Sequence, residues 1–297
     1  MHVTVFTSPN LNASNEIYFF AWQFFNGNRM NTKSENITYK TADDSISAYL
    51  AYPEDNTKHP GIVLIHEIFG LDEHTKKVAD RLAAEGYIVL APHLFSSKKL
   101  SGTLTPANIS SAMKFIMSIP VDKQRDQNYR DELLSKFDAS EKEAVSSVNQ
   151  ILFVNRPVDL FTEYLSCGID YLNSLERTNG KIGSAGFCFG GGMSINLGCT
   201  GKTDACVIFY GENPDPISKI KNVKGAIMGL YGGEDHRINS GLGELVKAMV
   251  DYKKPFTVKM FPGAHHAFFN DTRPQTYNQK AAEEAWGILL RFFGSNL

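Results

Sequence analysis

The sequence has few of the features that mark membrane, secreted or nucleic-acid-binding proteins. No apolar run reaches the ~18 residues that a membrane-spanning helix needs. The stretch Ile17 to Phe25 is aromatic and short, and neither a preceding Lys or Arg nor a small-residue cleavage site marks it as a secretory signal. Thirty basic residues against 32 acidic ones leave a formal charge of −2, with no basic block longer than a pair. We therefore expect neither nucleic acid nor a membrane surface as a partner.

Cysteine is also scarce. The four cysteines lie close together in the chain without a Cys-x-x-Cys pair; they are Cys167, Cys188, Cys199 and Cys206. This spacing fits neither a zinc ribbon nor a small disulfide scaffold, so we expect reduced thiols in a cytoplasmic protein. The segment from His66 to His74 lacks the His-Glu-x-x-His spacing of a helical zinc site. The sequence thus predicts no metal and no other cofactor.

The chain of 297 residues is long enough to bury a substantial core. Its composition, 42% hydrophobic and 21% charged, is that of an ordinary globular protein. The interpretable pattern begins at Met30, so we set residues 1–29 aside as an N-terminal extension of unknown role. We expect residues 30–297 to form a single domain, in a monomer or a dimer.

Short apolar runs alternate with helical periodicity along this domain. Residues 61–67 and 87–92 are continuous apolar runs, typical of strands that are buried on both faces. Between them, Val78 and Leu82 lie at helical spacing and Gly86 ends the helix. Further strands are predicted at 46–53, 181–187, 205–211, 225–232 and 256–262, with helices among them. This pattern predicts an α/β fold with a doubly wound, mostly parallel sheet.

Residues 96–179 interrupt the pattern, because they contain no convincing strand and read as a series of helices. An insertion of this length in an α/β domain predicts a helical cap or lid near the edge at which the strands end.

Side chains that can act as acids, bases or nucleophiles follow four of the predicted strands. Glu67 ends the first apolar run, Cys188 follows a later strand, Asp235 follows a Gly-Gly turn, and His265 and His266 follow the last strand. Ligands of open α/β sheets bind where the strands end. We therefore expect these side chains to share one site.

The stretch "GFCFG" around Cys188 has the form of the nucleophile elbow Gly-x-Ser-x-Gly, with cysteine in place of serine. The N-terminus of the following helix, predicted from Gly191, favours a thiolate. A buried cysteine beside a packing turn is the alternative. A nucleotide-binding loop is disfavoured, because neither Gly-x-Gly-x-x-Gly nor Gly-Lys-Ser/Thr occurs here.

The order Cys188, Asp235, His266 along the chain is the order of the α/β-hydrolase triad. In that fold the backbone N–H after the nucleophile and one from an early strand loop form the oxyanion hole. The corresponding donors here are Phe189 and Ile68.

These residues resemble the dienelactone hydrolase (carboxymethylenebutenolidase) family of the α/β-hydrolase fold. The resemblance rests on "HEIFGL", "GFCFGG", "GGEDH" and "GAHHAF", and it extends over residues 36–293. It implies Cys188 as the nucleophile, Asp235 and His266 as its triad partners, and Glu67 as a carboxylate beside the thiol. His266 rather than His265 is the match, because a small residue and Phe follow it.

The resemblance also implies a substrate site on the insertion. The stretch "RDQNY" is similar to the family's Arg-Glu-Gln-x-Tyr, which makes Arg125 and Tyr129 candidates for substrate binding. The family's second substrate arginine is absent, because Asn270 stands in its place. Arg273 and Arg237 are candidates to replace it.

The expected reaction is hydrolysis of a small lactone or ester through an acyl-enzyme. A carboxylesterase or thioesterase with another substrate is an alternative within the same chemistry. A non-catalytic small-molecule-binding protein would keep the fold without the reaction. A redox role for Cys188 is disfavoured, because no resolving cysteine is adjacent in the sequence.

Overall fold

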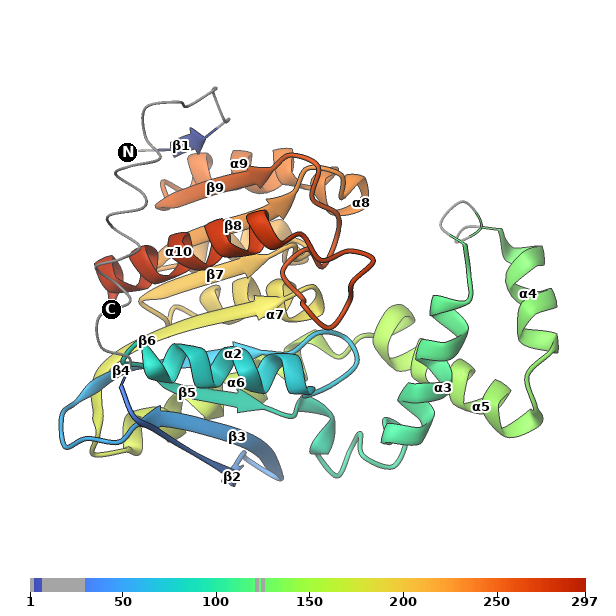
Figure 1. Ribbon diagram of the computed structural model, residues 1–297, viewed down its shortest axis with the longest axis horizontal. Helices are drawn as coiled ribbons and strands as arrows, with labels where there is room; N and C mark the ends of the chain where they lie inside the picture. The colour runs from blue at the N-terminus through green and yellow to red at the C-terminus, as the bar shows by residue number, and fades with distance from the viewer. Residues whose placement is uncertain (1–2, 7–29, 121–122, 124–125) are drawn as a thin grey trace.

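The computed structural model describes residues 3–6, 30–120, 123 and 126–297. Within these residues a single sheet has the strand order β1-β9-β8-β7-β6-β4-β5-β3-β2 (Figure 1). All of its strands run in one direction except β3, which pairs antiparallel with both β5 and the edge strand β2. The strands are β1 (Val3–Phe6), β2 (Thr32–Lys40), β3 (Ser45–Pro53), β4 (His59–Ile65), β5 (Ile88–Pro92), β6 (Thr178–Phe187), β7 (Ala205–Phe209), β8 (Ala226–Gly232) and β9 (Phe256–Phe261).

Two edge strands were not expected from the sequence. Strand β2 pairs antiparallel with β3, but most of its side chains are exposed, so it lacks the apolar alternation that identifies a strand. Strand β1 pairs parallel with β9 and lies within the segment 1–29 that the sequence analysis set aside. The apolar runs in the sheet interior, β4 and β5, lie where the sequence places them.

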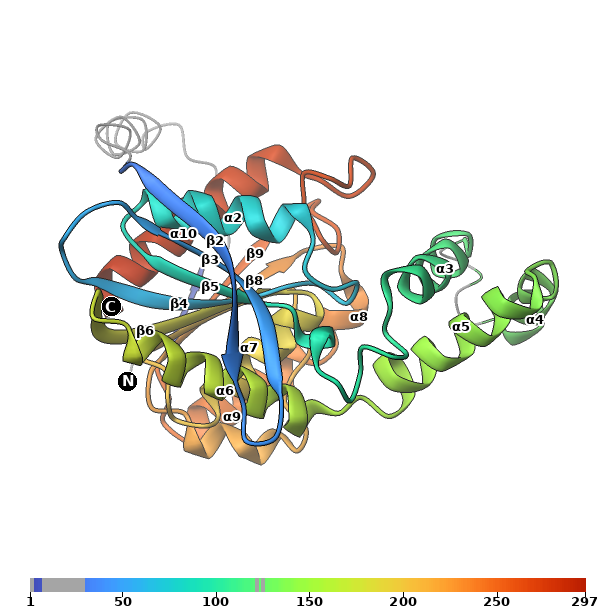
Figure 2. The same cartoon turned by 90° about the horizontal axis from the view of Figure 1, so that it is seen from below.

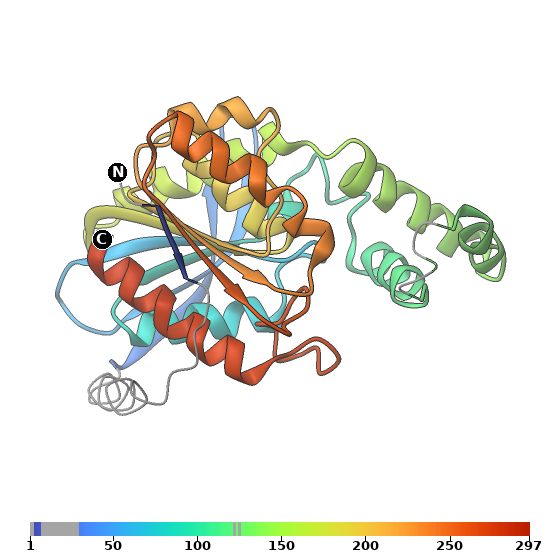
Figure 3. The same cartoon turned by 90° about the horizontal axis from the view of Figure 1, so that it is seen from above.

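Helices cover both faces of the sheet (Figures 2 and 3). On one face, α2 (Glu73–Ala84) and α10 (Gln279–Asn296) pack on a core that includes Leu64, Phe187 and Phe293. The other face carries α6 (Val158–Ser174), α7 (Phe189–Gly198) and α9 (Leu242–Asp251). Short helices lie in the connections: η1 (Leu94–Ser96), η4 (Ile217–Asn222) and α8 (His236–Asn239). The fold is therefore the doubly wound α/β sheet that the sequence predicts.

The insertion forms a helical arm, which we define as the described residues of 106–154. It contains α3 (Pro106–Met117), α4 (Gln127–Ser135), α5 (Ala139–Asn149) and η3 (Gln150–Val154). Figures 1, 2 and 3 show that the arm extends outward from the sheet instead of lying over it as a lid. It has an apolar cluster of its own, formed by Phe115, Ile119, Phe137 and Val145. The last helix of the predicted insertion, α6, instead packs on the sheet.

Among the helices that the structure describes, none is both long enough and apolar enough to cross a membrane.

Candidate active site

Cys188 lies between β6 and α7, on the sharp turn that the sequence predicts. Its backbone has φ 55° and ψ −115°, a conformation that is rare for a residue with a side chain. A Cβ on Gly186 would lie 2.1 Å from the Gly190 carbonyl oxygen, and one on Gly190 would lie 2.3 Å from the Ile65 oxygen. The turn therefore requires glycine at both positions. Helix α7 begins directly after Cys188, two residues earlier than the sequence analysis placed it.

His266 and Asp235 are held together at the same edge of the sheet. Nδ1 of His266 lies 2.5 Å from Oδ2 of Asp235, whose carboxylate is buried. Asp235 also caps α8, since its Oδ1 accepts the Ile238 N–H at 3.4 Å. The side chain of His265 is exposed instead. The structure thus pairs Asp235 with His266 and not with its neighbour.

The pKa of His266 connects it with Cys188. Burial disfavours the imidazolium, but the charge and hydrogen bond of the Cys188 side chain, together with the Asp235 carboxylate, raise the pKa of His266 to about 10. Because Nδ1 faces Asp235, Nε2 is the ring nitrogen available to Cys188. The thiol, the imidazole and the carboxylate therefore form one connected chain of polar groups.

Glu67 lies at the end of β4 and is fully buried. Arg273 donates to its Oε2 at 2.7 Å, while the other carboxylate oxygen has no partner among the described residues. The guanidinium also lies over the ring of Phe69, 5.2 Å from its centroid. Arg273 belongs to the same loop as His266, so this ion pair ties the histidine loop to the end of β4.

The two expected oxyanion donors lie in neighbouring segments. Ile68 is buried in the turn after β4, in which Gly70 N–H donates to the Glu67 carbonyl at 3.3 Å. The first turn of α7 packs against the end of β4, since a Cβ on Gly190 would also lie 2.6 Å from the His66 oxygen. Between described residues, neither Ile68 N–H nor Phe189 N–H donates to a backbone carbonyl beyond its own helix or strand. Their availability to an oxyanion stays a prediction.

One residue expected on the substrate side, Tyr129, lies elsewhere. Tyr129 is on α4 and packs on the apolar cluster of the helical arm, away from the strand ends (Figure 1). Arg125 lies outside the described residues. Of the two candidate replacement arginines, Arg237 pairs with Glu212, and Arg273 alone reaches a residue of the site. Asn270 is fully buried, and its Oδ1 accepts from Thr272, so it shapes the loop.

Tyr210 is a site residue that the sequence analysis missed. It follows β7 with φ 40° and is completely buried, and its ring centroid lies 5.1 Å from that of His266. Burial, together with the charges of Glu67 and Cys188, raises its pKa well above the ordinary range. Its hydroxyl has no hydrogen-bond partner among the described residues. The sequence analysis placed Tyr210 inside the strand predicted at 205–211, whereas β7 ends at Phe209. The positive φ that sets this tyrosine apart appears only in the structure.

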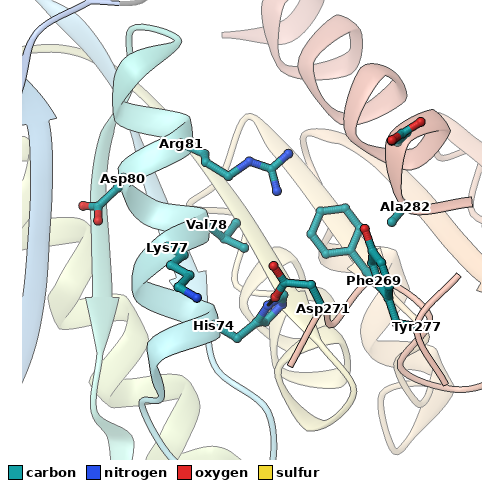
Figure 4. A pocket seen from close by; sticks show the side chains of 10 residues that line it. His74, Lys77, Val78, Asp80, Arg81, Phe269, Asp271, Tyr277 and Ala282 are labelled. Atoms are coloured by element: carbon teal, nitrogen blue, oxygen red, sulfur yellow. Dashed lines mark hydrogen bonds and ion pairs between the residues drawn. The ribbon is translucent and has the colours of Figure 1, made fainter. Parts of the chain in front are cut away.

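A separate cavity of about 360 Å³ lies between α2 and the segment that leads into α10 (Figure 4). His74 on α2 and Asp271 lie side by side in its lining, with 3.2 Å between Nδ1 and Oδ1. The His74 ring also contacts Phe187, the residue before the cysteine, with 5.5 Å between centroids. The contact between His74 and Asp271 gives the histidine loop a second anchor. Among the described residues, no group of three or more His, Cys, Asp or Glu side chains could hold a metal ion.

Comparison with known proteins identifies relatives of this arrangement. The model of the "Dienelactone hydrolase family" matches residues 46–297. A protein of Saccharolobus solfataricus named "Putative carboxymethylenebutenolidase" is 39% identical over 260 residues, which cover 87% of this chain and 97% of that protein. The match therefore includes nearly the whole of both chains.

Solved structures share the fold. A Klebsiella pneumoniae protein described as "Putative Dienelactone Hydrolase" has a TM-score of 0.68 at 20% identity, covering 89% of this chain and 99% of its own. The dienelactone hydrolase-like promiscuous phosphotriesterase P91 from metagenomic libraries has a TM-score of 0.67 at 18% identity. The match covers 89% of this chain and 98% of that one. At these identities the likeness establishes the α/β-hydrolase fold.

Proposed function

Because this chain belongs to the dienelactone hydrolase family, and is thus a hydrolase of esters or lactones, we propose that it uses Cys188 as the nucleophile on a small lactone or ester. The proposed reaction is of the carboxymethylenebutenolidase type, in which a dienelactone is opened to maleylacetate. The observation that carries this proposal is the Cys188–His266–Asp235 chain of contacts on a strained elbow.

The proposed first step transfers the acyl group to sulfur. The Cys188 thiolate attacks the carbonyl carbon, and the resulting oxyanion accepts hydrogen bonds from the N–H groups of Ile68 and Phe189. Collapse of the tetrahedral intermediate breaks the ring C–O bond. His266 gives its Nε2 proton to the departing oxygen, which in a lactone stays attached to the acyl group.

The second step releases the product. His266, now neutral, takes a proton from water as the water oxygen attacks the thioester carbon. The C–S bond breaks, the carboxylic acid leaves, and Cys188 departs as the thiolate beside protonated His266. Glu67, which takes the thiol proton before the attack, then returns it to sulfur. Asp235 keeps the imidazole oriented through Nδ1 in both steps.

Glu67 and Arg273 are proposed to act on the substrate side of the thiol. Of the Glu67 carboxylate oxygens, one is held by the Arg273 guanidinium and the other has no partner among the described residues. A substrate carboxylate that competes for Arg273 would release Glu67 toward the Cys188 proton. Such a substrate would be a lactone that carries a carboxylate, because the nucleophile elbow and Arg273 lie at one site.

The test of the nucleophile uses p-nitrophenyl acetate and a panel of lactones, with the wild type, Cys188→Ala and Cys188→Ser. We expect turnover by the wild type, a transient acyl adduct on Cys188 by mass spectrometry, and a loss of at least 10³-fold in kcat for Cys188→Ala. The distant thiol variant Cys206→Ala is the matched control and should retain activity. No turnover and no adduct would instead favour a binding protein on the same fold.

Glu67 is tested by Glu67→Gln, which keeps the shape of the side chain and removes its charge. If the carboxylate takes the thiol proton, lactonase activity falls while the thermal midpoint stays near that of the wild type. Undiminished lactonase activity in this variant would exclude the role.

A further inference from the structure

His66 is a buried titratable residue that the reaction above leaves unused. Its side chain is fully buried between the ends of β4 and β5. Nδ1 lies 2.5 Å from the carbonyl oxygen of Glu67, and Nε2 lies 3.3 Å from the backbone nitrogen of Leu94. Each ring nitrogen therefore has one backbone partner.

These two partners fix the tautomer of the ring. The Leu94 N–H can only donate, so Nε2 must accept, and the single proton of the neutral ring is left on Nδ1. Nδ1–H then donates to the Glu67 carbonyl, which can only accept. Burial lowers the pKa of His66 to about 4, so the ring keeps this neutral form at neutral pH.

The hydrogen bond to Glu67 constrains the next amide along the chain. The C=O of Glu67 and the N–H of Ile68 belong to one planar trans peptide, in which they point in opposite directions. A donor that holds the carbonyl oxygen on one side therefore holds the Ile68 N–H on the other. The Gly70 N–H supports the same carbonyl, but from the longer distance of 3.3 Å.

The ring also contacts the other half of the expected oxyanion hole. It stacks on Phe189, with 6.0 Å between centroids and 30° between planes, and its edge packs on Phe95 at 5.0 Å. Phe189 supplies the second oxyanion N–H. One side chain thus bridges the two segments whose amides must point to the same oxygen.

We propose that His66 is a positioning residue for the oxyanion hole, acting through the orientation of the Glu67–Ile68 peptide. This inference rests on the proposed function, because it concerns the oxyanion formed after attack by Cys188. Without the Nδ1–H donor, the Glu67 carbonyl keeps only the longer hydrogen bond from Gly70 among the described residues, and the peptide can turn the Ile68 N–H away from the site.

The test compares two variants of equal polarity. In His66→Asn the amide nitrogen can occupy the place of Nδ1 and donate to the Glu67 oxygen. In His66→Gln the longer amide reaches the place of Nε2 and can satisfy Leu94, but it leaves the Glu67 oxygen without its side-chain donor. Loss of a single oxyanion donor costs about 10²–10³ in kcat. We therefore expect kcat to fall about 10–100-fold in His66→Gln and less than tenfold in His66→Asn, with KM changed less than about twofold in both.

A second readout separates positioning from general damage. Alkylation of Cys188 by iodoacetamide needs the thiolate but forms no oxyanion, because the attack occurs at a saturated carbon. Its rate and pH profile should therefore match the wild type in both variants. Equal kcat in His66→Gln and the wild type would overturn the proposal, as would equal losses in the two variants or a parallel loss of alkylation. If the proposed function itself fails, the wild type gives no ester turnover and no acyl adduct, which is a different outcome from any of these.

Discussion

The Arg273 guanidinium lies 2.7 Å from the buried Glu67 carboxylate and joins the histidine loop to the end of β4. Removing one partner of a buried ion pair leaves a charge without its counterion, which costs about 3 kcal/mol. We expect Arg273→Met to lower the free energy of unfolding by about this amount, since it leaves Glu67 charged and buried. Urea unfolding followed by circular dichroism measures the change.

The double variant Arg273→Met/Glu67→Gln is the control for this prediction. It removes the counterion and the buried charge together, so it should regain most of the stability that the single variant loses. Equal stability of the single and double variants would show that Arg273 acts through packing on Phe69 instead.

The pH dependence follows from the raised pKa of His266. Because this pKa is about 10 in the folded protein, against 6.5 for an ordinary histidine, the imidazolium persists through neutral pH. We expect ester hydrolysis to decline on the alkaline side near pH 10, where His266 loses the proton it gives to the leaving group. Its contribution to stability is complete below pH 6.5 and is lost as the pH rises through about 10.

Cys188→Ala tests the cause of this shift. The Cys188 charge is the largest of the interactions that raise the pKa of His266, so its removal should bring this pKa down toward the ordinary range. Titration of the His266 ring by NMR in both proteins measures the difference. An unchanged midpoint would assign the shift to Asp235.

The elbow glycines give a prediction about stability. A Cβ at Gly190 would lie 2.3 Å from the Ile65 carbonyl oxygen, and neither backbone segment can move without disturbing β4 or α7. We expect Gly190→Ala to lose at least about 3 kcal/mol, or to be recovered only as insoluble protein. Gly294→Ala is the matched control, because a Cβ there meets nothing within 4 Å. Similar thermal midpoints for the two variants would contradict the crowding argument.

The last prediction concerns the Tyr210 hydroxyl. It is buried without a hydrogen-bond partner among the described residues, so its desolvation is not compensated. We expect Tyr210→Phe to leave stability unchanged or to raise it by about 1 kcal/mol, as measured by urea unfolding. A clear loss of stability would mean that the hydroxyl has a partner in solution.

The interior of the sheet and the order of the site residues were predictable from the sequence, because both follow from local patterns. Apolar runs such as Val63 to Ile65 are long enough to identify buried strands, and strand ends collect functional side chains in this fold. Strand β2 was not predictable, since its exposed side chains show no alternation and it depends on pairing with β3.

The direction in which the insertion leaves the sheet depends on tertiary packing. Its helical character is visible in the sequence, but a helix pattern does not say against which surface the helix packs. Tyr129 consequently joins the cluster of the helical arm, whereas the motif similarity predicts it beside the substrate. The sequence identifies the helices of this segment, but it does not determine how far they lie from the turn at Cys188.

The sequence by itself determined the turn at Cys188, because only glycine fits the backbone contacts on either side of it. It also determined the spacing of Asp235 and His266 along the chain. Only the tertiary structure decided that Arg273 pairs with Glu67, that Tyr210 lies against His266, and that His66 holds the Glu67 carbonyl. Such contacts join residues through side-chain geometry, which depends on how separate strand ends and loops pack and not on any local pattern.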